Sequence, residues 1–98
     1  MNAEEYLIEN KKSIAQECKT IADTGSKPII TLKKSGNSYI HKISTVEEFG
    51  ARIPDDDFFK KMRDGINNAV LNKVIPIVVF EGQKAQIISL QDHFELKK

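Results

Sequence analysis

Two β-hairpins constrain the fold of this 98-residue chain more than any other feature of its sequence. Strand-forming residues run over 28–34 and 38–43, on either side of the turn-forming trio Ser35-Gly36-Asn37. A second hairpin, over 75–90, turns at Gly82-Gln83, where glycine at the first central position indicates a type II′ turn. The sequence therefore predicts four strands that share one sheet.

A long amphipathic helix is predicted ahead of the first hairpin, from residue 3 to residue 24. Asn2 and Glu5 are spaced as a capping pair at its start, and Gly25 stands where a left-handed C-terminal cap belongs. Its apolar residues recur at helical spacing and predict one buried stripe. They are Leu7, Ile8, Ile14, Ala15, Cys18, Ile21 and Ala22.

A second helix is predicted between the hairpins. Residues 44–49 indicate a short helical turn, capped by a hydroxyl at 44 or 45 and a glutamate at 47 or 48. Pro54 and the aspartates at 55–57 then mark the start of the longer helix, because proline and carboxylates both suit a first turn. Gly65 lies in its middle and leaves room for a break. Its apolar face is predicted to be Phe59, Met62, Ile66, Ala69 and Val70.

These elements predict an α+β fold with the order αββαββ. We expect a four-stranded, mainly antiparallel sheet with two helices packed on one face. The chain is predicted to be a single domain, 1–98, with 91–98 as a short C-terminal segment anchored by Phe94 and Leu96.

An offset of 48 residues aligns the two halves of the chain. It pairs the run 28–32 with 76–80, and the apolar positions of the two helices align at the same offset. One interpretation is an internal αββ duplication, with pseudo-repeats 3–44 and 55–90. The other is that similar composition aligns by itself, since both halves place an amphipathic helix before a β-rich run.

Composition excludes several classes of protein. The net charge of +1 argues against a strong nucleic-acid or membrane partner, and no apolar run is long enough to span a bilayer. The N-terminus lacks the pattern of a secretory signal, and the lone Cys18 cannot form an internal disulfide. We therefore expect a cytoplasmic protein.

Motifs of catalysis and cofactor binding are missing from the sequence. There is no glycine-rich phosphate loop and no cysteine or histidine pair at metal-ligand spacing. Cys18 is interpreted as a core residue, His41 as a partly buried hydrogen-bonded residue and His93 as an exposed one. The aspartates at 55–57 are better explained by the helix start than by acid–base chemistry. We predict no enzyme activity, no cofactor and no metal.

The first hairpin is locally basic. Between Thr24 and Val46 there are four lysines and no acid. Lys33, Lys34, Tyr39 and Lys42 are the candidate nucleic-acid contacts, since lysines bind phosphates and a tyrosine ring stacks on bases. The competing interpretation is an edge strand whose lysines prevent edge-to-edge pairing, and the absence of arginine favours it.

The second hairpin carries more apolar surface than helices on one side of the sheet would cover. Val78, Phe80, Ile87 and Ile88 are the predicted protein-interaction residues, because an uncovered patch of this kind marks an interface. The leading hypothesis is a non-enzymatic protein-interaction module: a small regulator, inhibitor or adaptor that binds a protein partner or itself as a homodimer. The alternatives are a weak nucleic-acid binder using the first hairpin and a structural oligomer subunit.

Overall fold

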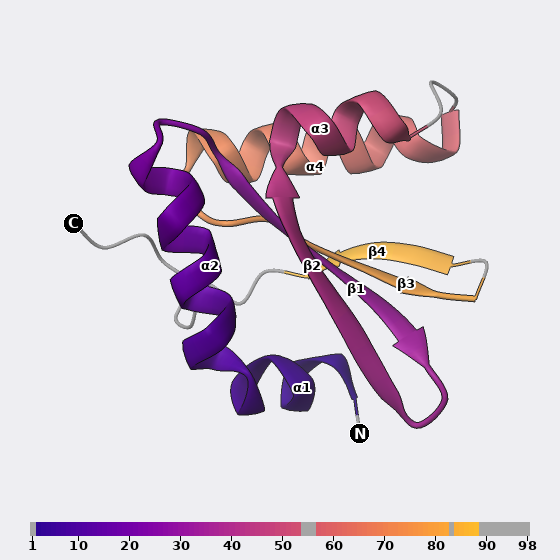
Figure 1. Cartoon of the computed structure of the whole chain (residues 1–98). Coiled ribbons are helices and arrows are strands. Elements are labelled where there is room, and N and C mark those ends of the chain that lie inside the picture. The colour runs from indigo at the N-terminus through magenta and orange to yellow at the C-terminus, as the bar shows by residue number, and fades with distance from the viewer. Residues whose placement is uncertain (1, 54–56, 83, 89–98) are drawn as a thin grey trace.

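Two units, each made of two helices and a hairpin, follow one another along the chain (Figure 1). The computed structural model describes residues 2–53, 57–82 and 84–88. The first unit contains α1 (Ala3–Glu9), α2 (Lys11–Asp23), β1 (Pro28–Ser35) and β2 (Ser38–Thr45). The second contains α3 (Val46–Arg52), α4 (Asp57–Leu71), β3 (Ile77–Glu81) and β4 (Lys84–Ile88).

The four strands form a mixed sheet in the order β2-β1-β3-β4. Each hairpin is antiparallel, but β1 and β3 pair in parallel, with Ile30 opposite Ile77 and Leu32 opposite Val79. The strands β1 and β3 are therefore central, and β2 and β4 lie at the two edges of the sheet. The predicted mainly antiparallel sheet is therefore wrong. The two hairpins meet through their first strands, which the helical connection brings together in the same direction.

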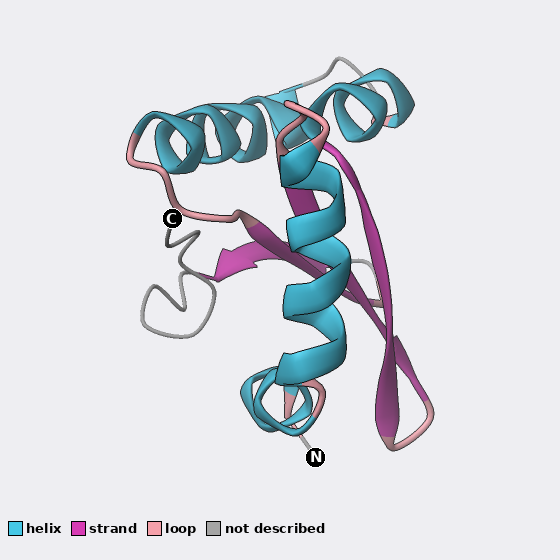
Figure 2. Ribbon diagram, turned by 60° about the vertical axis from the view of Figure 1, so that its left-hand side comes forward, coloured by secondary structure: helices cyan, strands magenta, loops and turns pink. Residues whose placement is uncertain are grey.

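Helices cover both faces of this sheet, so the predicted two-helix, one-face packing is also wrong. Alternate strand residues point to opposite faces, and each set enters its own core. The core on the α1–α2 side is made of Ala3, Leu7, Ile14, Cys18, Ile30, Leu32, Tyr39, Ile75, Ile77 and Val79. The core on the α3–α4 side is made of Ile29, Phe49, Met62, Ile66 and Val78. Figure 2 shows the two helix pairs approaching the strands from different directions.

The predicted first helix divides at Asn10. This residue has φ −105° and ψ 16°, and its side-chain amide donates a hydrogen bond of 2.9 Å to the carbonyl of Tyr6. Asparagine competes with the helical backbone in this way, which explains the break. The capping pair at the start is confirmed: the Glu5 amide donates to the side chain of Asn2 at 2.8 Å, and the Asn2 amide donates to the Glu5 carboxylate.

Other local predictions have mixed outcomes. Gly25 follows α2 with φ +86°, as a left-handed cap requires. Thr45 caps α3 by accepting a hydrogen bond of 3.1 Å from the Glu48 amide. The helix α4 runs through Gly65 without a break. Residues 54–56 and the proposed C-terminal segment 91–98 lie outside the described residues.

Residues paired by the offset of 48 occupy matching places in opposite layers. Ile14 and Cys18 of α2 lie in one core, and their counterparts Met62 and Ile66 of α4 lie in the other. A two-fold axis along the strands, between β1 and β3, would relate the halves in this way, because it preserves strand direction and exchanges the faces of the sheet. A common origin of the halves stays a prediction.

Candidate functional site

Two of the four residues of the predicted apolar interaction surface, Val78 and Phe80, lie in or beside a core of the protein. Val78 has an exposed fraction of 0% and packs in the core beneath α3 and α4. Phe80 is half-buried at the edge of the same core, with its ring centroid 6.4 Å from that of Phe49. In β4, Ile87 pairs with Val78 and Ile88 with Ile77. The second helix pair thus covers Val78, which was expected to face an external partner.

The four residues predicted to contact nucleic acid are divided between the two faces of the sheet. Lys34 pairs with Tyr39 across the hairpin, and Lys33 pairs with Ile40. Because neighbouring residues of a strand point to opposite faces, Lys33 and Lys42 lie on the α3–α4 side, and Lys34 and Tyr39 on the α1–α2 side. The structure does not bring the four side chains together.

Tyr39 is a core residue rather than a stacking platform. Its exposed fraction is 7%, and its ring lies 6.0 Å from that of Tyr6, measured between centroids. Its hydroxyl donates a hydrogen bond of 2.8 Å to Glu81. That bond raises the pKa of Tyr39, and burial of the side chain adds to the effect. The buried ring of Tyr39 therefore offers no open face on which a nucleic-acid base could stack.

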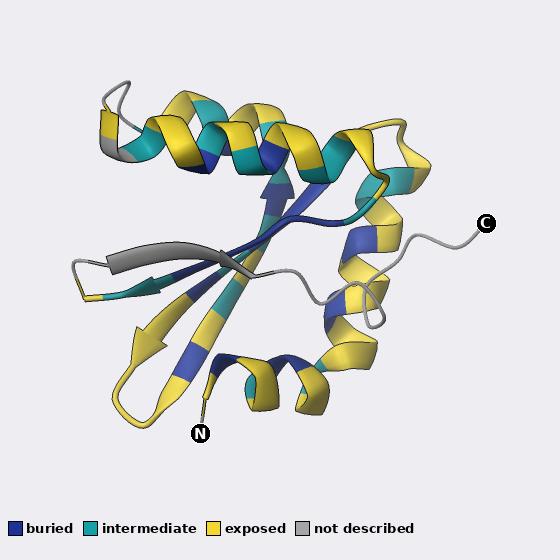
Figure 3. Ribbon diagram, turned by 180° about the vertical axis from the view of Figure 1, so that it is seen from behind, coloured by how far each residue is buried: buried dark blue, intermediate teal, exposed yellow. Residues whose placement is uncertain are grey.

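On the α3–α4 side of the sheet, the half of the first hairpin nearer its turn is not covered by helices. We call this the open hairpin face; it consists of Thr31, Lys33, Ile40 and Lys42, which share the α3–α4 side. The helices cover this side only at its other end, where Ile29 and Ser44 are buried. Ile40 has an exposed fraction of 60%, with an exposed lysine opposite it and another two residues along its own strand. Figure 3 shows exposed residues concentrated along this part of the hairpin, away from α3 and α4.

A hydrogen-bonded chain of three side chains ties the first helix pair to β2. The hydroxyl of Tyr6 lies 2.7 Å from Nδ1 of His41, and Nε2 of His41 lies 3.1 Å from Oε2 of Glu17. With a neutral imidazole, Nε2–H donates to the carboxylate and Nδ1 accepts from the tyrosine hydroxyl. Each of the three side chains comes from a different element, α1, β2 or α2. A local sequence motif therefore could not have predicted this hydrogen-bonded network. His41 is thus partly buried and hydrogen-bonded, as predicted, and it connects α1 and α2 to the sheet.

Cys18 lies in a setting that disfavours reaction. Cys18 has an exposed fraction of 1%, and burial, helped by the nearby Glu17 carboxylate, raises its pKa to about 12. The thiolate, which is the nucleophilic form, is therefore scarce at neutral pH. Among residues 2–53, 57–82 and 84–88, no group of three potential ligands converges on a metal-sized site. His93 and two of the three aspartates lie outside those ranges.

Comparison with protein-family models, with curated proteins and with solved structures finds no match to this chain. Across the described residues, the helices are too short or too polar to cross a bilayer. The fold and the open hairpin face therefore carry the functional argument by themselves.

Proposed function

We propose that the chain is a non-enzymatic protein-interaction module, a small regulator, inhibitor or adaptor, whose docking surface is β2 and the open hairpin face. One observation carries the proposal: β2 is an eight-residue strand at the edge of the sheet, with Ile40 exposed between lysines. The surface differs from the one expected from sequence, because Val78 is internal.

The edge of β2 offers backbone hydrogen bonds to an incoming strand. Within the described strands, β2 pairs with β1 on one side only. An extended segment that binds there gains affinity from main-chain hydrogen bonds and specificity from alternate side chains. An apolar side chain beside Ile40 would bury part of its exposed surface, at about 25 cal/mol per Å².

The positive charge of the open hairpin face favours an acidic segment as the binding partner. Lys33 and Lys42 are exposed, and no acid occurs between Thr24 and Val46. A partner strand with an apolar residue flanked at two-residue spacing by carboxylates matches this pattern, because such residues share one face of a strand. Two copies joined through β2 would bring four lysines onto one face without a counter-charge. The charge pattern therefore favours an acidic partner over the homodimer.

Neighbouring lysines supply a matched pair of variants. Lys33 and Lys34 are adjacent, equally charged and both exposed, but they lie on opposite faces. We expect Lys33→Glu to weaken binding of a synthetic peptide, in which valine is flanked at two-residue spacing by glutamates, by about tenfold or more. Lys34→Glu should change it less than threefold. Amide shifts in the NMR spectrum of the labelled chain should concentrate in β2.

Three results would contradict the proposal. Equal losses from Lys33→Glu and Lys34→Glu would indicate a general charge effect. Peptide-induced shifts confined to other elements would place the contact elsewhere. Binding of random-sequence DNA that falls steeply between low and moderate salt, and that Lys33→Glu abolishes, would assign the face to nucleic acid instead.

A further inference from the structure

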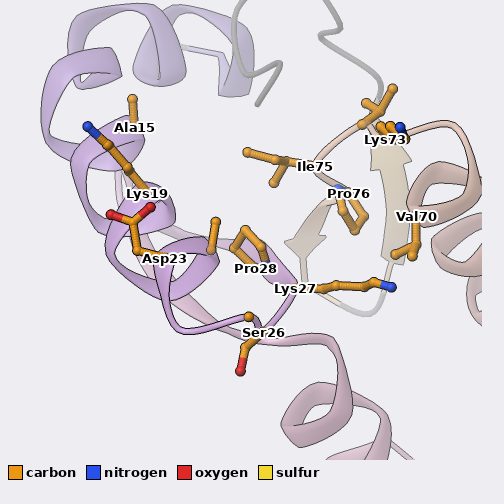
Figure 4. Close-up of a pocket in the computed structure, with 13 residues that line it drawn as sticks. Ala15, Lys19, Asp23, Ser26, Lys27, Pro28, Val70, Lys73, Ile75 and Pro76 are labelled. Carbon is orange, nitrogen blue, oxygen red and sulfur yellow. The ribbon is translucent and has the colours of Figure 1, made fainter. Parts of the chain in front are cut away.

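A cleft opens at the end of the sheet opposite the turn of the first hairpin. It has a volume of about 730 Å³ and lies between α2 and α4, over the start of β1 and the approach to β3. Its walls are mainly apolar, and Figure 4 shows Pro28, Val70, Ile75 and Pro76 around the opening. Sites for small organic molecules commonly have about 300–1,000 Å³ and a largely apolar lining.

Three lysines and one acid stand among the residues that line this cleft: Lys19, Lys27, Lys73 and Asp23. The helices α2 and α4 both end here, and each helix end carries about half a negative elementary charge. Against three lysines, these two ends and the carboxylate of Asp23 leave a net charge of about +1. The negative charge of the helix ends and of Asp23 therefore does not balance the three lysines. The remaining positive charge favours a ligand with a single anionic group.

The backbone at Lys73 gives an independent observation. Its φ of 59° lies in the left-handed region, which is unfavourable for a residue with a Cβ atom. Two hydrogen bonds hold it there, from the Lys73 amide to the Val70 carbonyl at 3.1 Å and from the Val74 amide to the Ala69 carbonyl at 2.9 Å. This is a Schellman motif, in which glycine normally fills the left-handed position.

The other helix that ends at the cleft has the expected glycine. Gly25 follows α2 with φ +86°, and it aligns with Lys73 at the offset of 48. The chain thus keeps a strained lysine at one of two corresponding positions, beside a ligand-sized cleft. Backbone strain retained in this manner is frequent at functional sites.

We propose that the cleft binds a small amphiphile with an apolar body and one anionic head group, of the medium-chain carboxylate class. The apolar body contacts the walls formed by Val70, Ile75 and the two prolines. The head group lies at the rim, where Lys73 and Lys27 supply positive charge. This site is separate from the open hairpin face, so its success or failure does not depend on the protein-docking proposal.

Decanoate is the probe, and decyltrimethylammonium is its control, since the two share the ten-carbon chain and differ in the sign of charge. Titrations by calorimetry and by amide shifts should show decanoate binding at least tenfold more tightly. Lys73→Ala should weaken decanoate about fivefold, whereas Lys73→Arg should keep the affinity within twofold. Lys34→Ala, a substitution on the hairpin, should leave it unchanged. Circular dichroism of each variant is the control that it is folded.

Several outcomes would overturn this assignment. Equal affinity for the two amphiphiles would show that the charge of the head group does not determine binding. Unchanged decanoate affinity in a folded Lys73→Ala variant would show the same for the charge of Lys73. Shifts that avoid the residues of the cleft would remove the site. The chain's own residues 89–98, which follow Ile88 in the sequence, are the alternative occupant that the test must distinguish. A tenfold gain in decanoate affinity on Phe94→Ser would assign the cleft to that segment.

Discussion

Replacing Lys73 with glycine should stabilise the protein, although it removes a side chain from the cleft. The left-handed conformation at this residue, φ 59°, costs an L-residue roughly 1–2 kcal/mol relative to glycine. Glycine gives back about 0.4–1 kcal/mol, because it adds conformational freedom to the unfolded chain. The two effects leave a net stabilisation of about 0.5–1 kcal/mol. For a domain of this size that is a rise in Tm on the order of 4 °C.

Urea denaturation followed by circular dichroism measures this effect directly, with the midpoint rising at an unchanged slope. Lys73→Ala is the matched control, because it removes the ammonium group and keeps the Cβ atom that causes the strain. It should not stabilise the protein. If both variants changed stability equally, the side chain rather than the backbone would be responsible. A loss of stability in Lys73→Gly would refute the argument from strain.

Three further perturbations test other parts of the structure. Val78 is fully buried, so Val78→Ala should cost about 2 kcal/mol in urea denaturation, and Val78→Asp should unfold the chain rather than only block a partner. Cys18 keeps its proton to about pH 12 in the folded state and releases it near pH 9 when unfolded, so stability should fall between these values by roughly 1 kcal/mol per pH unit. Cys18→Ala should lack that contribution to the slope. Tyr6→Phe removes the hydroxyl that meets His41, and thermal denaturation should show a loss of about 1 kcal/mol.

Local structure was largely predictable because it depends on neighbouring residues. The capping pair Asn2–Glu5, the left-handed Gly25 and both hairpins follow from chemistry within a few positions. The relation between the hairpins depends on contacts 45 or more residues apart, which local patterns do not encode. One signal did point to it: the run 77–80 is apolar at every position, as expected of a strand covered on both faces. Helices on one face alone do not account for that run, whereas helices on both faces do.

The candidate sites depend on register and on long-range packing, which explains why they were predicted only in part. Strand alternation separates Lys33 from Lys34, but which lysine shares a face with Tyr39 follows from the register of the hairpin. The structure has a two-residue turn, Gly36-Asn37, between Ser35 and Ser38. The cleft and the chain of hydrogen bonds at His41 join elements that are far apart in sequence. The left-handed lysine also escaped prediction, since lysine does not indicate this conformation.

The near symmetry of the two halves leads to a last prediction. Gly25 and Lys73 occupy corresponding helix ends, and a Cβ atom built on Gly25 meets nothing within 4 Å. Gly25→Lys should therefore lower stability by the net of backbone strain and the lost freedom of the unfolded chain, about 0.5–1 kcal/mol, and Lys73→Gly should recover a similar amount. The double variant should unfold within about 0.5 kcal/mol of the original chain in urea denaturation, because the strained residue is only moved from one helix end to the other. A much larger loss would show that the two helix ends are not equivalent, and that the correspondence at an offset of 48 residues does not extend to their caps.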